Sequence, residues 1–412
     1  MKKASLISIG NEILSGQTID TNAAYLSREL LSVGMPVASS YTVADDVDAI
    51  VRALNLAGGD ADVVLATGGL GPTDDDLTRQ AFADFLGAEL QFRDELLVKM
   101  QDFFARRNLQ MPEKNRIQAY IPAGAKPLPN NRGTAPGIMA ETGGKVFVAL
   151  PGVPSEMKQM FAESVLPQLR ESTLDQAVVV RKLKCYGAGE STIAEMLGEL
   201  MQRGRNSLIN CTPEFGVITL HVVATAGSHR EAEKMADEDE KCLRNVLGDL
   251  VYGTRDQTLA EVVGLEFARE GKTIALAESC TGGLLAKLLT DVSGASKYFT
   301  HGWVTYSNSA KAGELGVPAD LIERHGAVSE EVARAMARGA REKAGADYAI
   351  GITGIAGPAG GTEQKPVGLV YICVDSHRKS EVECCRFSGN RGSNRRRAAQ
   401  TALNMLRLRF KD

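Results

Sequence analysis

A serine with the potential for nucleophilic chemistry follows a short apolar stretch in the last third of this 412-residue chain. The segment 278–283, ESCTGG, comes after the apolar residues 274–277 and opens a helical pattern at 282–289. A hydroxyl at such a strand-to-helix turn is exposed, and N–H groups nearby can stabilise an oxyanion. Because a serine hydroxyl alone is a weak nucleophile, it needs a base. The motif therefore predicts Ser279 as a nucleophile that depends on a second residue.

The segment 306–311, YSNSAK, offers that base. Tyr306 closes an expected strand, and Lys311 falls in the first turns of the next helix. A lysine buried beside a hydroxyl has a lowered pKa and can act as a general base. Tyr306 is expected to relay the proton or to orient the ammonium. A histidine triad is poorly supported, since only His301 and His325 lie in plausible loops here.

Cys280 is the rival nucleophile, because thiols are intrinsically more reactive than hydroxyls. Neighbouring side chains at a strand end point to opposite sides, so only one of the two can face a pocket. We expect Cys280 to be buried as packing.

Two further loops of small residues end or follow apolar strands in this part of the chain. The segment 353–358, TGIAGP, exposes backbone and suits a ribose or phosphate. The segment 389–391, GNR, opens the last helix region, and its arginine can pair with a phosphate. The arginine run 395–397 is expected to be a solvated helix face.

A glycine- and aspartate-rich loop follows a short apolar run near the N-terminus. It spans residues 67–78, TGGLGPTDDDLT. Small residues let backbone N–H groups approach a phosphate, and the three aspartates could hold a hard cation such as Mg²⁺. Such a metal would neutralise charge and assist attack on a pyrophosphate. The alternative is a plain turn whose acids cap a helix. Similar loops occur at residues 10–12, 131–137 and 151–157.

The elements that must position these loops form two alternating patterns. Near the N-terminus, strands are expected at 4–9, 37–43 and 62–66, with helices at 21–33 and 47–57, the second ending at Gly58 and Gly59. This βαβαβ order predicts a doubly wound α/β domain, which binds ligands at the carboxyl ends of its strands.

A second alternating pattern begins at residue 256. Helices are expected at 258–269, 282–289, 330–344 and 395–408, with strands at 274–277, 301–306, 348–353, 367–374 and 380–386. Between the two patterns, strands at 177–185 and 217–225 and helices at 191–201 and 231–247 indicate a small α+β module. We place the domains at residues 1–171, 172–255 and 256–412.

Composition narrows the class of protein. The formal net charge of −4 gives no basic footprint for nucleic acid or an anionic membrane. No run approaches the length of a membrane span, and residues 1–10 read as a first strand rather than a signal peptide. The seven cysteines form no CxxC pair, which favours neither disulfides nor a zinc site and fits the reducing cytoplasm.

Taken together and in order, these motifs resemble the CinA family of competence/damage-inducible proteins over the whole chain. The resemblance implies an N-terminal molybdopterin-binding-like doubly wound domain, a KH-type middle domain and a C-terminal α/β deamidase domain. It also implies that the first domain is a metal-dependent ADP-ribose pyrophosphatase. Asp75 and Asp76 match the acidic pair that would serve the metal, whereas Asp74 falls at a variable position. The expected nucleotide contacts are Thr67, Gly68, Gly69, Gly71 and Asn131.

The set ESCTGG, YSNxAK, TGIAGP and GNR resembles the nicotinamide mononucleotide (NMN) deamidase domain. The resemblance implies hydrolysis of the NMN carboxamide to nicotinic acid mononucleotide and ammonia, without a cofactor. Ser279 would be the nucleophile, and Lys311 and Tyr306 would complete a Ser-Lys-Tyr site. The expected substrate contacts are Thr281, Gly282, Gly283, Thr353, Gly354, Gly357 and Arg391.

Three functions of the N-terminal domain remain open. The domain could hydrolyse a nucleotide, could only bind a nucleotide or pterin, or could serve molybdopterin chemistry by fold analogy.

The middle module carries no complete nucleic-acid-binding loop. Its residues 187–190, GAGE, lack the second glycine of a GxxG loop, and residues 237–240 are acidic. We therefore expect a spacer or dimerisation module rather than RNA binding. The resemblance suggests a homodimer.

Overall fold

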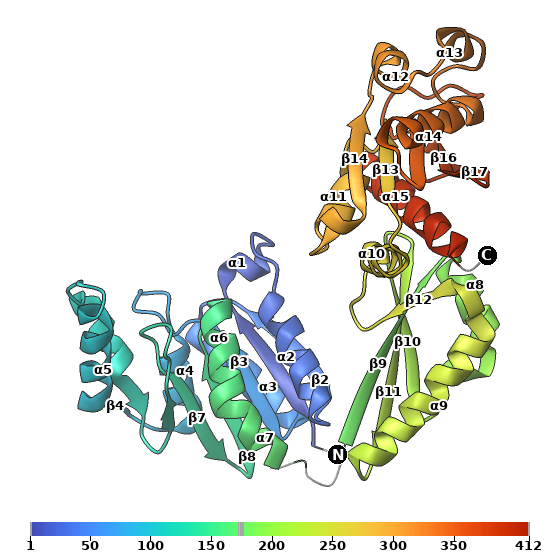
Figure 1. The fold of residues 1–412 in the computed structure, drawn as a ribbon. Coiled ribbons are helices and arrows are strands. Elements are labelled where there is room, and N and C mark those ends of the chain that lie inside the picture. The colour runs from blue at the N-terminus through green and yellow to red at the C-terminus, as the bar shows by residue number, and fades with distance from the viewer. Residues whose placement is uncertain (1, 172, 174–176, 411–412) are drawn as a thin grey trace. The chain divides into compact units, whose positions relative to one another are not determined.

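The computed structural model describes residues 2–171, 173 and 177–410, so the expected boundary at residue 172 lies outside the described residues. Figure 1 shows the chain, which divides into two compact units. The first comprises residues 1–180 and 224–235, and the second comprises residues 181–223 and 236–412. Within the described residues, no helix is long and apolar enough to cross a membrane.

A six-stranded sheet in the order β2-β1-β3-β8-β7-β6 organises the first unit. Its parallel half consists of β1 (Ala4–Ile9), β2 (Val37–Val43), β3 (Val63–Thr67) and β8 (Lys145–Leu150). The three expected strands are therefore confirmed. The other half is antiparallel, made by β7 (Gly137–Thr142) and β6 (Lys126–Leu128), so the sheet is mixed rather than wholly parallel.

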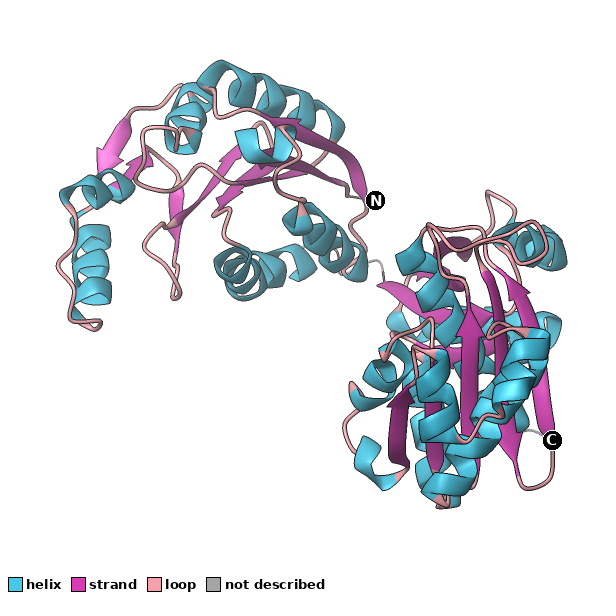
Figure 2. Cartoon of the chain, turned by 90° about the horizontal axis from the view of Figure 1, so that it is seen from above, coloured by secondary structure: helices cyan, strands magenta, loops and turns pink. Residues whose placement is uncertain are grey.

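Helices lie on both faces of this sheet, as Figure 2 shows, and each face has its own apolar core. One core includes α3 (Val47–Asp60) and α4 (Thr78–Leu86), and the other includes α2 (Thr21–Ser32) and α6 (Pro154–Met160). The prediction that α3 ends at Gly58 was wrong. The helix continues because Gly58 packs against the Phe147 ring, where a Cβ would lie 3.0 Å from a ring carbon.

Several short elements of the first unit were not predicted. They are α1 (Asn11–Leu14), β4 (Leu90–Phe92), α5 (Asp94–Ala105), the 3₁₀ turn η1 (Glu113–Ala119), β5 (Tyr120–Pro122), the π-helical turn η2 (Phe161–Val165) and α7 (Leu166–Glu171).

The middle module is a four-stranded sheet in the order β10-β11-β9-β12, with two helices. The expected strands are β9 (Ala177–Tyr186) and β11 (Val217–Ala226), and the expected helices are α8 (Glu190–Leu197), extended by η3 (Gly198–Met201), and α9 (His229–Leu247), followed by η4 (Gly248–Leu250). The strands β10 (Leu208–Glu214) and β12 (Val251–Thr254) were not predicted. The Tyr186 hydroxyl is 2.8 Å from that of Thr401, and Arg407 donates to the Asp249 carbonyl at 2.6 Å, which fixes this module to the last helix of the same unit.

The second unit also contains a five-stranded sheet in the order β14-β13-β15-β16-β17. The strands are β13 (Ile274–Glu278), β14 (Phe299–Val304), β15 (Tyr348–Gly354), β16 (Leu369–Ser376) and β17 (Ser380–Arg386). The first three are parallel, and the last two run antiparallel to their neighbours. The carboxyl ends of β13, β14 and β15 therefore meet at one edge, where the three sequence motifs follow them.

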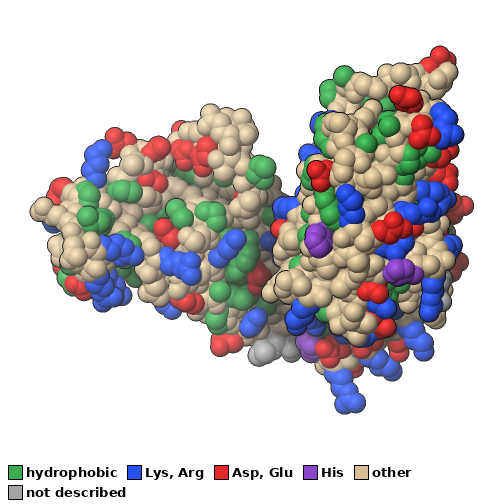
Figure 3. Space-filling view, turned by 45° about the horizontal axis from the view of Figure 1, so that its top comes forward, with side chains coloured by type: hydrophobic (Ala, Val, Ile, Leu, Met, Phe, Trp, Pro, Cys, Tyr) green, Lys and Arg blue, Asp and Glu red, His purple; other side chains and the backbone are tan. Residues whose placement is uncertain are grey.

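Helices complete this part of the molecule. They are α10 (Leu259–Glu270), α11 (Leu284–Thr290), η5 (Ala295–Lys297), α12 (Asn308–Leu315), α13 (Ala319–His325), α14 (Glu330–Ala344) and α15 (Arg391–Arg409). Helix α14 packs very close to β15. Glycine at position 351 permits this approach, since a Cβ there would lie 2.4 Å from the Ala333 carbonyl oxygen. On the face in Figure 3, basic and acidic side chains both occur over each unit.

Candidate functional site

The turn that carries Ser279 is fixed on both sides by the protein. The Ser279 N–H donates to the Ile352 carbonyl of β15 at 2.9 Å. The buried carboxylate of Glu278 accepts the N–H groups of Leu285 at 3.1 Å and Ala286 at 2.8 Å in α11. These bonds satisfy N–H groups that a helix start leaves without partners. The serine is thereby held at the junction of strand and helix.

Lys311 is the immediate partner of Ser279. Its Nζ lies 3.0 Å from the Ser279 Oγ and 2.8 Å from the Thr305 carbonyl oxygen. Position 311 lies in the first turn of α12, whose N-cap Ser307 accepts the Ala310 N–H. The cap fixes where α12 begins, and so directs the lysine back toward the end of β13.

Burial changes the acid–base behaviour of this lysine. Its side chain is 1% exposed, and desolvation lowers the pKa of Lys311 below its ordinary value. Among the described residues, the hydrogen-bond partners of its amine are the Ser279 hydroxyl and the Thr305 carbonyl, neither of which carries a charge. A neutral amine can accept the proton of a hydroxyl that it contacts, so this pair can generate a nucleophile.

Cys280 faces away from this pair into the apolar core. It is 5% exposed and packs with the core of the second unit. Burial raises the pKa of the Cys280 thiol to about 12, so the thiol stays protonated near neutral pH. Only the thiolate is strongly nucleophilic, which leaves Ser279 as the reactive group of the turn.

The structure does not bring the Tyr306 hydroxyl to Lys311. Tyr306 is 59% exposed, lies beyond the end of β14 at Val304, and accepts a hydrogen bond from Arg391 at 2.8 Å. The expected strand end at Tyr306 was wrong. Arg391 also donates to the Gly357 carbonyl at 2.9 Å, so it links two of the predicted loops. It is the Thr305 carbonyl that orients the Lys311 amine.

The other predicted contacts of this domain lie at the same sheet edge. Gly282 and Gly283 adopt positive φ values of 58° and 86°, which the tight turn requires. The buried Thr281 Oγ1 has no protein partner within the described residues. Thr353 donates to the Ala327 carbonyl at 2.7 Å and thus has a structural role in this state. Gly354 ends β15, and Gly357 precedes a cis proline in the same loop.

Sequence reasoning missed Arg395 and Asn394. Arg395 donates to the Thr281 carbonyl from Nε at 3.0 Å and from Nη2 at 2.6 Å. It is half-buried, so the expectation of a solvated face was wrong for this position. Asn394 is fully buried and donates to the Ala356 and Gly389 carbonyls. Their i and i+4 spacing from Asn390 and Arg391 was the one available signal, because it places them on the inward face of α15.

The N-terminal motifs surround a cavity of about 500 Å³ at the carboxyl ends of β1 and β3. The predicted residues Thr67, Gly68, Gly69 and Gly71 line it, and so do Asp75 and Asp76. The lining further includes Gly10, Glu12, Asp20, Asn22, Gln118, Gly152 and Glu156. The structure therefore brings together the loops at residues 10–12, 67–78 and 151–157, and the loop at 131–137 contributes Thr134 and Ala135.

The loop at 67–78 is fixed by side chains that follow it. The Thr78 hydroxyl donates to the Gly68 carbonyl at 2.7 Å, and the buried Arg79 donates to the carbonyls of Leu70 and Gly71, each at 2.6 Å. Desolvation lowers the pKa of Arg79 to about 10, although nearby Asp76 opposes the shift. Arg79 was not predicted, because its partners are backbone carbonyls.

The two predicted metal ligands differ in their freedom. The Asp76 carboxylate accepts the N–H of Gly71 at 2.7 Å and that of Thr73 at 2.8 Å, one on each oxygen. The Thr73 hydroxyl lies within hydrogen-bond distance of both carboxylates, and its hydrogen bond to the exposed Asp75 lowers the pKa of Asp75. Among the described residues, no group of three His, Cys, Asp or Glu side chains is arranged to hold a metal. Mg²⁺ is commonly held by one or two carboxylates together with substrate phosphates, and Asp75 fits that arrangement better than Asp76.

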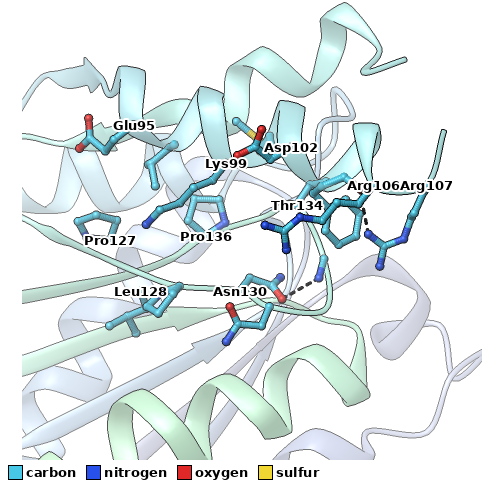
Figure 4. Close-up of a pocket in the computed structure, with 16 residues that line it drawn as sticks. Glu95, Lys99, Asp102, Arg106, Arg107, Pro127, Leu128, Asn130, Thr134 and Pro136 are labelled. Atoms are coloured by element: carbon cyan, nitrogen blue, oxygen red, sulfur yellow. Dashed lines mark hydrogen bonds between the residues drawn. The ribbon is translucent and has the colours of Figure 1, made fainter. Parts of the chain in front are cut away.

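Asn131 lies elsewhere, in a second cavity of about 770 Å³ between α5 and the loop after β6. Figure 4 shows Lys99 on α5 and Arg106, directly after the end of α5, on the other side of this cavity from Asn130. Asn131 donates to Glu163 at 3.3 Å. Its neighbour Asn130 lines the same second cavity, and the Asn130 amide donates at 2.7 Å to Glu156, which lines the first cavity.

Family models match three successive parts of the chain. Residues 5–171 match a probable molybdopterin binding domain, residues 180–253 the KH domain of damage-inducible protein CinA, and residues 256–410 the CinA C-terminal domain. These matches confirm the predicted three-domain α/β architecture.

Similar proteins extend over nearly the full chain. The CinA-like proteins of Dictyoglomus turgidum and Kosmotoga olearia are each 41% identical over 406 residues, which is 98% of both chains for each comparison. A solved structure of CinA from Thermoplasma acidophilum, described as of unknown function, is 36% identical with a TM-score of 0.38, and the match covers 41% of this chain and 98% of that one. The full-length similarity shows that the chain belongs to the CinA family of competence/damage-inducible proteins.

Proposed function

We propose that the C-terminal domain is a serine-dependent amidohydrolase that converts NMN to nicotinic acid mononucleotide and ammonia. The observation that carries the proposal is the 3.0 Å contact between the buried Lys311 amine and the Ser279 hydroxyl. The choice of NMN rests on the resemblance of the four loop motifs, since the geometry by itself supports an acyl transfer to serine.

The reaction can be written with these residues alone. Neutral Lys311 takes the Ser279 proton as Oγ attacks the carboxamide carbon, and N–H groups of the turn stabilise the oxyanion. The protonated Lys311 returns that proton to the leaving nitrogen, and ammonia departs from an acyl-serine. Lys311 then accepts a proton from water as water attacks the ester. As the Oγ–C bond breaks and the acid leaves, Lys311 returns this proton to Oγ, which restores both residues. The exposed part of Arg391 would pair with the nucleotide phosphate.

Ammonia release from NMN by the purified full-length protein tests the proposal. We expect release in the presence of a chelator, because no step needs a metal. Wild-type protein that releases no ammonia from NMN, across neutral to alkaline pH, would reject NMN as substrate.

For the N-terminal domain we propose metal-dependent cleavage of ADP-ribose to AMP and ribose 5-phosphate. The supporting observation is the 500 Å³ cavity in which glycine-rich backbone lies beside Asp75. Asp75 would hold a divalent metal together with the substrate phosphates, and the metal would neutralise pyrophosphate charge. The N–H groups of Gly69 and Leu70 would orient the phosphates, since those of Gly68 and Gly71 already donate to the Leu150 carbonyl and to Asp76. A domain that only binds a nucleotide or pterin is the alternative.

Replacement of Asp75 by asparagine tests this site. We expect Asp75→Asn to lower AMP formation from ADP-ribose by about a hundredfold or more in Mg²⁺, as the loss of one charged ligand would. Asp74→Asn is the matched control, because Asp74 is equally exposed and precedes it in the same loop. Equal loss in both variants would contradict the assignment of the metal to Asp75. Binding of ADP-ribose by wild type without AMP formation would leave the domain a binder.

A further inference from the structure

The carbonyl of Thr281, two residues after the nucleophile, accepts the Leu284 N–H at 3.3 Å and is also held by an arginine from the last helix. Arg395 in α15 donates to it twice, from Nε at 3.0 Å and from Nη2 at 2.6 Å. The guanidinium lies directly against the turn, since a Cβ on Gly282 would be 3.4 Å from Nη2. A charged donor that gives two hydrogen bonds to one oxygen makes a strong and geometrically specific contact.

This contact fixes the far end of a turn whose near end is already fixed. At the near end, the Ser279 N–H donates to the Ile352 carbonyl of β15. At the far end, the peptide that joins Thr281 to Gly282 is oriented by Arg395, and its N–H donates back to the Ser279 carbonyl at 3.1 Å. The backbone between these two points has little freedom left.

The N–H groups of Cys280 and Thr281 lie between the two fixed points. Among the described residues neither donates to a backbone carbonyl. They belong to the two residues that directly follow the nucleophile in the turn. Donors of an oxyanion hole are effective because they are oriented before the charge develops.

We propose that Arg395 is a positioning residue, which holds the turn at residues 279–283 so that the Cys280 and Thr281 N–H groups form the oxyanion hole. The inference rests on the proposed function, because it assumes that Ser279 attacks an electrophile. It concerns a residue that does not itself touch the substrate. Its predicted effect is therefore on the rate of the chemical step and not on substrate binding.

The experiment compares Arg395→Met and Arg395→Lys with wild type in the full-length protein. We expect Arg395→Met to lower kcat for NMN by about ten- to a hundredfold, somewhat less than outright removal of an oxyanion donor, with KM within about twofold. Arg395→Lys, which keeps a charged donor, should recover part of the loss. Arg338→Met is the matched control, since Arg338 is an exposed arginine on α14.

A second readout does not depend on NMN. An alkyl fluorophosphonate reacts with an activated serine: the Oγ–P bond forms, the P–F bond breaks, fluoride leaves, and Lys311 takes the hydroxyl proton. Its phosphoryl oxygen carries negative charge in the same position as the amide oxyanion. We expect Arg395→Met to slow labelling of Ser279, located by mass spectrometry, by a similar factor, while the thermal midpoint remains close to that of wild type.

The NMN assay and the labelling of Ser279 distinguish a failure of NMN as the proposed substrate from a failure of the role proposed for Arg395. If wild-type protein is labelled at Ser279 but releases no ammonia from NMN, then NMN is not the substrate. The labelling rates of wild type and Arg395→Met then test the role of Arg395 by themselves. Unchanged kcat and labelling in Arg395→Met would overturn the positioning role. A raised KM with unchanged kcat would also overturn it, because Arg395 would then act in binding.

Discussion

Replacement of Ser279 by alanine is expected to abolish ammonia release from NMN, whereas Cys280→Ala should retain most of it. Loss of the nucleophile removes the covalent route, which costs at least about a thousandfold in kcat in serine hydrolases. Cys280 contributes packing and a thiol whose pKa is raised to about 12, so its removal leaves the chemistry intact. Deamidase assays at equal concentrations of folded protein measure the two effects.

The comparison of Ser279→Ala with Cys280→Ala also tests whether Cys280 is the nucleophile. A Cys280→Ala variant without activity, beside an active Ser279→Ala variant, would reverse the assignment. Truncation of a buried cysteine leaves a small cavity and costs some stability, so thermal midpoints of both variants must accompany the rates. Ser279→Cys adds a further check, because it retains a nucleophile at the same position.

Replacement of Lys311 by methionine is expected to reduce deamidation by about a thousandfold or more, since the serine then lacks its base. Methionine retains the length and apolar character of the side chain, so the buried site remains filled. In wild type, kcat/KM should rise with pH through the pKa of Lys311, which desolvation places below its ordinary 10.5. This rising limb should be missing from the residual activity of Lys311→Met.

The same substitution has a predicted sign for stability. Because the folded-state pKa of Lys311 is lowered, the unfolded chain binds more protons at pH values between the folded pKa and 10.5. The group therefore disfavours folding at lower pH, and this penalty is lost as pH rises toward 10.5. We expect Lys311→Met to unfold at a higher temperature than wild type near neutral pH, with the difference shrinking in alkali. A methionine variant that is less stable at neutral pH would contradict the lowered pKa.

Local patterns predicted much of the fold and placed the main site motifs. Strands β1 and β3 were found from short apolar runs, β2 from its alternating pattern, and the turn at Ser279 from a strand followed by a helix pattern. The antiparallel strand β7 was not predicted, although it pairs with β8, the next strand along the chain, across a short turn at residues 143 and 144. The prediction that Cys280 is buried as packing is confirmed, since it is 5% exposed and belongs to the apolar core of the second unit.

The contacts that sequence reasoning missed mostly end on backbone atoms. The Thr305 carbonyl orients Lys311, and the Thr281 carbonyl receives Arg395. Carbonyl oxygens are present at every residue, so no residue type marks the ones that matter. Tyr306 shows the converse, because its residue type suggested a partner of Lys311 but its position after Val304 directs it to Arg391.

The loop at residues 67–78 has a consequence for the thermodynamics of ligand binding. Asp76, Thr78 and Arg79 already satisfy the loop's backbone groups with hydrogen bonds from within the protein. Its conformational entropy is therefore lost during folding rather than when a ligand arrives. A phosphate-bearing ligand should bind with a small change in heat capacity and no change in the proteolytic susceptibility of this loop, as expected for a rigid receptor.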